Sequence, residues 1–175
     1  MSAPRVGALL GLAPTARGLG YIVIDGAHRL CDWGVREARG GDKNGQALRV
    51  AAALMERCAP SALIVEDIRT ARRHPRIVAL LAELTKAAEA RGMRVQRFTR
   101  SALRAHFGVH TKHAIAEEVA KAIPVLAVQL PRKRKPWMSE DARQALFDAA
   151  ALALLALPES DVSEAKAPAH PAGLA

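Results

Sequence analysis

The sequence from residue 10 to residue 21 reads Leu10-Gly11-Leu12-Ala13-Pro14-Thr15-Ala16-Arg17-Gly18-Leu19-Gly20-Tyr21. Its first part belongs to a short apolar run, Val6 to Leu12, which is typical of a buried strand. Residues 14–18 have the composition of a loop, and a second strand is predicted from Tyr21 to Ile24. Asp25-Gly26 then predicts a hairpin turn into a third strand, His28 to Gly34. Three antiparallel strands are therefore expected to open the fold.

Helices and strands alternate after this start, and their order predicts an α/β fold, a mixed sheet covered by helices. Ser139 is expected to cap the last helix, with Glu140 and Asp141 in its first turn, where the helix dipole favours acids. The expected elements are a helix from Asn44 to Cys58, a strand from Ala62 to Val65 that ends in Glu66-Asp67, a helix from Pro75 to Arg91, a strand from Arg94 to Phe98, and helices at Ser101–Phe107, Thr111–Ile123 and Ser139–Leu157.

The length of 175 residues suits one domain, which we expect to span residues 1–157. Residues 158–175 are rich in Ala, Pro, Ser and Glu without periodicity, and this composition predicts a disordered tail. No run approaches 18 apolar residues and the first residues do not resemble a signal peptide, so neither a membrane span nor a membrane partner is expected. Cys31 and Cys58 lack a second pair, which favours reduced thiols in a cytoplasmic protein.

Charge indicates the class of partner. The net charge is +9 and the sequence pI is about 10.4, which favours polyanions, nucleic acid before a membrane surface. Aromatic residues make up only 3% of the chain. A protein that binds single strands by base stacking normally needs more of them, whereas one that grips the phosphates of duplex or branched DNA does not.

Cations gather in predicted loops beside the sheet edge, where they are expected to bind phosphates. One group follows the strand that ends at Glu66, one lies in the first loop, and the densest run precedes the last helix. These residues are Arg69, Arg72 and Arg73, then Arg17, and then Arg132, Lys133, Arg134 and Lys135. Gly18-Leu19-Gly20 leads into a strand rather than a helix, so the dinucleotide and P-loop contexts fail and no nucleotide cofactor is expected.

Acids are expected at the same edge. In this topology the ends of the first strand and of the Glu66 strand can converge with the start of the last helix, and carboxylates there could hold Mg²⁺ or Mn²⁺. Two such ions about 4 Å apart would stabilise attack of water on a phosphodiester. Glu66 closes an apolar strand and Asp148 interrupts an apolar helix, so both are candidate metal ligands. Where the first strand should carry its carboxylate, the chain has Ala13.

Together these segments resemble the RuvC family of Holliday-junction resolvases, which belongs to the RNase H superfamily. Residues 10–21 resemble the opening strand and turn of that family, whose pattern has an Asp before the Pro. Ala62–Glu66 resembles its second acidic strand and Asp148–Ala153 its final helix, while Lys112 lies where the family has a basic residue opening the preceding helix. The resemblance covers residues 6–157. It implies an RNase H-like fold and a homodimeric, Mg²⁺-dependent endonuclease for branched DNA, with four acids around the metals.

Two of those four acids are missing. Ala13 replaces the Asp that bridges both metals in the family, and Ala145 stands where the family has its other helix acid, three residues before Asp148. Asp141 is the nearest candidate substitute. It lies seven residues from Asp148, which is about 10.5 Å along a helix and too far to share one ion, so helix capping is its expected role. Ala13 has three explanations: an engineered substitution in an active enzyme, a divergence with another ligand recruited, or a protein that binds DNA without cutting it.

The leading hypothesis from the sequence is a RuvC-like endonuclease, dependent on divalent metal, that acts on branched or structured DNA in recombination or repair. Its catalytic candidates are Glu66, Asp148 and Asp141, and Lys112 joins the cations that bind DNA. The first alternative is a catalytically silent, structure-selective DNA-binding protein on the same fold. A further alternative is an interaction subunit whose basic loop binds RNA or an acidic protein.

Overall fold

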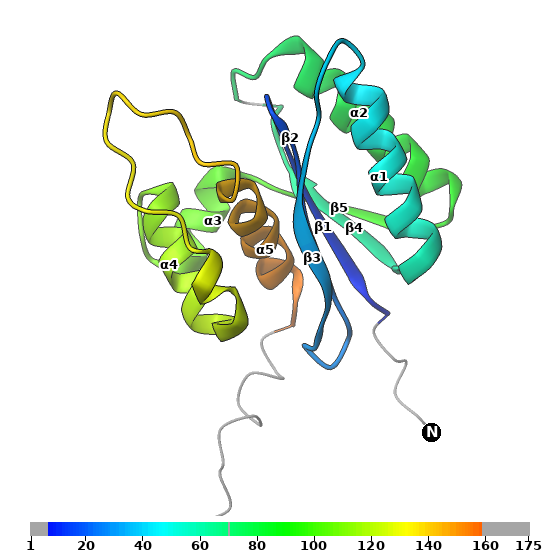
Figure 1. The fold of residues 1–175 in the computed structure, drawn as a ribbon. Coiled ribbons are helices and arrows are strands. Elements are labelled where there is room, and N and C mark those ends of the chain that lie inside the picture. The colour runs from blue at the N-terminus through cyan, green and yellow to red at the C-terminus, as the bar shows by residue number, and fades with distance from the viewer. Residues whose placement is uncertain (1–6, 70, 159–175) are drawn as a thin grey trace, which may run out of the picture.

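A five-stranded mixed sheet forms the centre of the computed structural model, which describes residues 7–69 and 71–158 (Figure 1). The strand order is β3-β2-β1-β4-β5, with β1, β2 and β3 antiparallel and with β4 and β5 parallel to β1. This arrangement confirms the predicted α/β class and the three antiparallel strands that open it. The strands are β1 (Leu9–Thr15), β2 (Gly18–Ile24), β3 (Leu30–Glu37), β4 (Ala62–Glu66) and β5 (Arg94–Phe98).

Helices cover both faces of the sheet (Figure 1). Side chains alternate along β1, so Leu10 and Leu12 pack toward one face with α1 and α2, while Leu9 and Ala13 pack toward the other with α4 and α5. In the described part of the chain no helix is long and apolar enough to cross a membrane. The helices are α1 (Lys43–Cys58), α2 (Pro75–Ala90), α3 (Arg100–Phe107), α4 (Lys112–Ala122), the 3₁₀ helix η1 (Pro124–Gln129) and α5 (Gln144–Ala156).

Two glycines let α5 lie directly on the sheet. A Cβ atom at Gly11 would stand 2.5 Å from the carbonyl oxygen of Ala149, and one at Gly20 would overlap the carbonyl group of Ala145. Neither position therefore accepts a larger residue without moving the helix. This close approach, together with the small alanines of α5, fixes Asp148 at the same sheet edge as the end of β1.

The first hairpin is tighter than the sequence predicted. Pro14 was placed in a loop, but β1 continues to Thr15 and pairs with β2 down to Thr15–Gly18. Thr15 closes the turn because its Oγ1 accepts the backbone N–H groups of Arg17 and Gly18. Pro14 is tolerated because β4 pairs with β1 only as far as Gly11, which leaves that side of β1 open. Beyond Gly11 the two strands no longer pair, and the cleft described below opens there.

Other boundaries also differ. Val6 lies outside the described residues, and β3 starts at Leu30 rather than His28 because Asp25 Oδ1 accepts the backbone N–H groups of Ala27 and Arg29 and lengthens the turn. α3 begins at Arg100 rather than Ser101, because Thr99 caps it, with its Oγ1 accepting the N–H of Ala102. The expected tail, residues 158–175, lies outside the described residues apart from Pro158.

The start of the last helix was predicted wrongly. α5 begins at Gln144, after Arg143, and has no side-chain cap, so Ser139 does not cap it. Asp141 does not cap it either. Its carboxylate accepts the backbone N–H of Arg143 and its carbonyl accepts that of Gln144, which closes a turn just before the helix. Residues 139–142 therefore form an irregular segment that is free to line the cleft.

Candidate nucleic-acid interface

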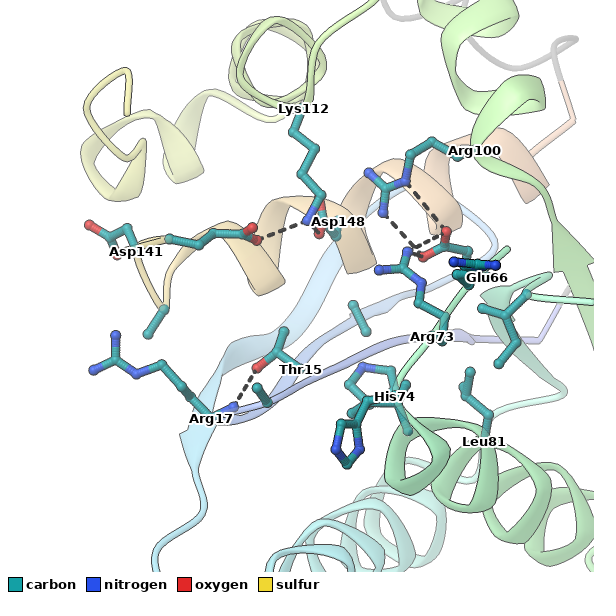
Figure 2. Close-up of a pocket in the computed structure, with 18 of the residues that line it drawn as sticks. Thr15, Arg17, Glu66, Arg73, His74, Leu81, Arg100, Lys112, Asp141 and Asp148 are labelled. Carbon is teal, nitrogen blue, oxygen red and sulfur yellow. Dashed lines mark hydrogen bonds and ion pairs between the residues drawn. The ribbon is translucent and has the colours of Figure 1, made fainter. Parts of the chain in front are cut away.

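A cleft of about 650 Å³ opens where β1 and β4 separate (Figure 2). Its walls come from the β1–β2 turn, the end of β4, the start of α2, the first residues of α3 and α4, and the segment that precedes α5. The cleft brings together most of the residues that the sequence singled out. They are Ala13, Arg17, Glu66, Arg72, Arg73, Lys112, Asp141 and Asp148.

Glu66 is held by two arginines. Its side chain is 17% exposed, and Arg73 Nη2 lies 2.6 and 2.7 Å from its two carboxylate oxygens. Arg100 approaches the same oxygens from α3, with Nη2 at 3.1 Å and Nε at 3.4 Å. Burial acts to raise the pKa of Glu66, but the charges and hydrogen bonds of Arg100 and Arg73 outweigh it and keep that pKa below its ordinary value. The carboxylate stays ionised, and two cations exceed its charge.

Arg100 is the important residue that the sequence analysis missed. It is the first residue of α3, directly after Thr99 and the end of β5. Since β5 runs parallel to β4, the ends of both strands reach the same edge, and a cation just after β5 must lie near Glu66. That position in the strand order was the available signal. Burial acts to lower the pKa of Arg100, but the nearby carboxylates, Glu66 above all, raise it.

Asp148 is bound from the other side of the cleft. Lys112 Nζ lies 3.3 Å from its Oδ2 and 2.9 Å from Glu140 Oε1, and Gln144 Nε2 donates to its Oδ1 at 3.1 Å. The side chain of Asp148 is 14% exposed. Lys112 is aimed at this acid because it opens α4, whose N-cap is Thr111. One cation here serves two carboxylates, the reverse of the arrangement at Glu66 (Figure 2).

The residues present do not fit the pair of divalent ions that the family resemblance implies. Ala13 and Ala145 offer methyl groups, and both are buried. Both oxygens of Glu66 are already hydrogen-bonded to guanidinium groups, so an ion approaching them would meet two positive charges. Within residues 7–69 and 71–158, no group of three or more His, Cys, Asp or Glu side chains could hold a metal ion.

Of three further residues that the sequence predicted to bind phosphate, two line the cleft and one does not. Arg17 and Arg72 line its rim. Arg69 does not belong to the lining and instead pairs with Asp67, with Nη2 2.6 Å from Oδ2. The hydrogen bonds of Arg69 lower the pKa of Asp67 to about 2. Asp67 therefore serves the turn after β4 rather than the cleft, in line with its alternate position on the strand.

The basic loop, residues 131–138, joins η1 to the segment before α5 and projects from the body of the protein (yellow in Figure 1). Arg132, Lys133, Arg134 and Lys135 are all exposed, and no ion pair joins these four side chains to an acid of the described chain. The loop leads directly into Ser139, the first residue of this segment to line the cleft.

Comparison with known proteins identifies the fold. No family model and no curated protein sequence matches the chain. Among solved structures, RuvC from T. thermophilus in complex with a Holliday junction substrate matches with a TM-score of 0.64 and 19% identity, over 85% of this chain and 91% of that chain. A second T. thermophilus RuvC structure matches with a TM-score of 0.61 and 21% identity, over 85% of this chain and 92% of that chain. The predicted RuvC-like, RNase H-type fold is thereby confirmed.

Proposed function

We propose that this chain is a structure-selective DNA-binding protein that holds branched DNA without metal-dependent cleavage. The proposal rests on the ion pairs of Glu66 and Asp148, the two acids that this chain keeps of the four expected from the family resemblance. Glu66 is bound by Arg73 and Arg100, and Asp148 by Lys112. A nuclease of this fold would need those carboxylates as metal ligands. Here they anchor the cations instead.

The cleft is suited to a DNA phosphate. A guanidinium has five N–H donors. Glu66 accepts hydrogen bonds from only some of the N–H groups of Arg73 and Arg100, so the others remain available to a ligand. The remaining donors and the positive charge left over at Glu66 favour a backbone phosphate at this end of the cleft. Arg17 and Arg72 extend the same surface along the rim. We propose that the basic loop supplies most of the affinity through further phosphates.

A four-way junction is the proposed DNA form. The solved RuvC that is bound to a Holliday junction substrate shares this fold over 91% of its length, which supports a junction as the ligand of this cleft. We also propose a homodimer, because a two-fold assembly would present two clefts to the symmetric arms of a junction. A cytoplasmic location and a role in recombination or repair belong to the same proposal.

A metal-dependent endonuclease is the second candidate. It is favoured by Glu66 and Asp148 lining one cleft on a resolvase fold. For activity it would have to release Glu66 from its arginines and recruit a third ligand. Glu140 and Asp141 are the other carboxylates of the lining, and they are bound to Lys112 and Arg143.

Binding to a synthetic four-way junction and to a linear duplex of the same sequence tests the proposal. We expect tighter binding to the junction in EDTA, with an affinity that falls steeply as salt is raised. Equal affinity for junction and duplex would remove the structure selectivity. Cleavage of the junction by this chain in Mg²⁺ or Mn²⁺, abolished by Asp148→Asn, would favour the endonuclease instead.

A further inference from the structure

We propose that Trp137 stacks on an exposed base at the branch point of the bound DNA and so supplies the structure selectivity. This inference rests on the proposed function, since it names the residue that would read the DNA form. Trp137 is 78% exposed, and the neighbouring Met138 is exposed as well. The other five aromatic side chains of Phe, Trp and Tyr are buried or partly buried. Trp137 therefore has no packing role that would explain an indole at this position.

The surroundings of Trp137 indicate a nucleic-acid base rather than an apolar protein surface as its partner. Four consecutive cations, residues 132–135, precede it in the basic loop, and they complement a phosphate backbone. Lys135 Nζ lies 5.4 Å from the centre of the indole ring, within range of a cation–π contact. That contact lies on one face of the ring, and the 78% exposure of the residue leaves the indole accessible to a stacked base.

The position of Trp137 links it to the cleft. It precedes Ser139 by two residues, so their Cα atoms lie within about 7 Å of each other, and Ser139 is part of the cleft wall. A strand whose phosphates contact the cleft rim and the basic loop would thus pass its bases close to the indole.

Stacking of this kind distinguishes branched from linear DNA. In a continuous duplex each base pair is covered by its neighbours, and an indole reaches a base face only after unstacking a step, which costs a few kcal/mol. At a branch point, base faces at the ends of the arms are exposed or easily exposed. A single exposed aromatic therefore adds affinity for a junction and little for a duplex, while the cations bind both.

The test compares Trp137→Ala and Trp137→Phe with the unaltered chain, on a four-way junction and a matched duplex in EDTA. Base–aromatic stacking predicts roughly 5- to 150-fold weaker junction binding for Trp137→Ala, unchanged duplex binding, and most of the affinity kept by Trp137→Phe. Val128→Ala is the control, because Val128 is also an exposed apolar residue but has no run of cations before it. In Trp33→Phe protein, where Trp137 is the one remaining tryptophan, junction but not duplex should quench the fluorescence.

The outcomes separate this inference from the proposed function. Junction-selective binding that Trp137→Ala leaves intact would overturn the inference, assign the indole to a protein contact, and leave the proposed function standing. Equal weakening for junction and duplex would also overturn it, because the residue would then contribute to general binding only. Failure of the unaltered chain to bind either DNA would overturn both proposals.

Discussion

The Glu66 cluster (Glu66, Arg73 and Arg100) and the basic loop both carry positive charge, but they hold it differently. In the cluster two guanidiniums surround one carboxylate that is 17% exposed, so part of their charge is balanced inside the protein. In the basic loop, residues 132–135 are exposed and are not joined to acids of the described chain. We therefore propose that the cluster mainly stabilises the fold, while the loop mainly binds the partner.

This proposed division explains how a RuvC-like fold could keep an acid at this edge without a metal ion. An acid at the end of β4 needs a compensating positive charge when it is partly buried. Divalent ions can supply that charge, and here Arg73 and Arg100 supply it. The acid at this edge of the sheet keeps a counter-charge, and the proposed phosphate binding would not depend on metal. The predictions below test whether stability and binding are divided in this way.

The largest expected effect is on binding by the basic loop. Replacing Arg132, Lys133, Arg134 and Lys135 together by Gln should weaken junction and duplex binding on the order of 10²-fold or more at low salt, and should reduce the slope of log affinity against log salt by up to about 4. The free energy of unfolding should hardly change, because the four side chains are exposed. Fluorescence anisotropy at several salt concentrations measures this. Four exposed cations outside the cleft, Arg29, Lys86, Arg91 and Lys121, changed to Gln form the charge-matched control.

The next effect is on stability, at the Glu66 cluster. Glu66→Gln leaves two partly buried guanidiniums without a counter-charge, so the free energy of unfolding should fall by about 1–3 kcal/mol. Glu118→Gln, which removes the acid of an i,i+3 pair with the exposed Lys121, should cost less than about 0.5 kcal/mol. Urea unfolding followed by circular dichroism measures both. If Glu66→Gln proved as stable as the unaltered chain, the structural role of the cluster would be refuted.

The unaltered chain and Glu66→Gln should differ in free energy of unfolding by an amount that depends on pH, because the pKa of Glu66 is lowered in the folded chain. A carboxyl group with a lower pKa in the folded chain contributes stability above its unfolded pKa, here near 4.5, and loses it as pH falls through the folded value. The stability gap between the unaltered chain and Glu66→Gln should therefore be constant from pH 7 to pH 5 and shrink below pH 4. Urea unfolding at pH 7, 5 and 3.5 tests this. A gap that widened in acid would mean that the arginines do not stabilise the ionised form.

The smallest expected effect is on cleavage. Ala13→Asp alone should not produce a metal-dependent nuclease, because Glu66 remains bound by Arg73 and Arg100 and Ala145 still offers no carboxylate. Ala13 is 8% exposed, so the new acid should lower stability unless a cation reaches it. Ala13→Asn separates the effect of charge from that of size. Junction cleavage by Ala13→Asp in Mn²⁺ would show that the missing acid is the single defect and that the arginines yield to metal.

The sequence predicted the fold because the pattern of its elements permits few arrangements. Apolar runs separated by turn residues gave three antiparallel strands, and the later alternation of strands and helices gave the mixed sheet. That order alone places Glu66, Asp148 and Ala13 at one edge, and the structure brings all three into one cleft. The exact ends of several elements depend on local hydrogen bonds of Thr15, Asp25 and Thr99, which composition does not specify.

The ion pairs of the cleft could not be predicted in the same way. Arg73 lies in the loop before α2 and Arg100 opens α3, so their meeting at Glu66 depends on how two helices pack beside β4 and β5. The sequence predicted Arg73 as a phosphate ligand but did not reveal that its side chain also pairs with Glu66, because sequence shows a cation but not the direction of its side chain. The contact between Lys112 and Asp148 similarly requires the tertiary packing of α4 against α5.

The most direct test of the central claim is junction binding by the unaltered chain in EDTA and in Mn²⁺ at constant ionic strength, with the DNA strands then examined on a denaturing gel. If cations of the protein have replaced the metal centre, the two affinities will be equal and every strand will remain intact. Binding that requires Mn²⁺, or strands cut near the branch point, would contradict the account and return Glu66 and Asp148 to the role of metal ligands.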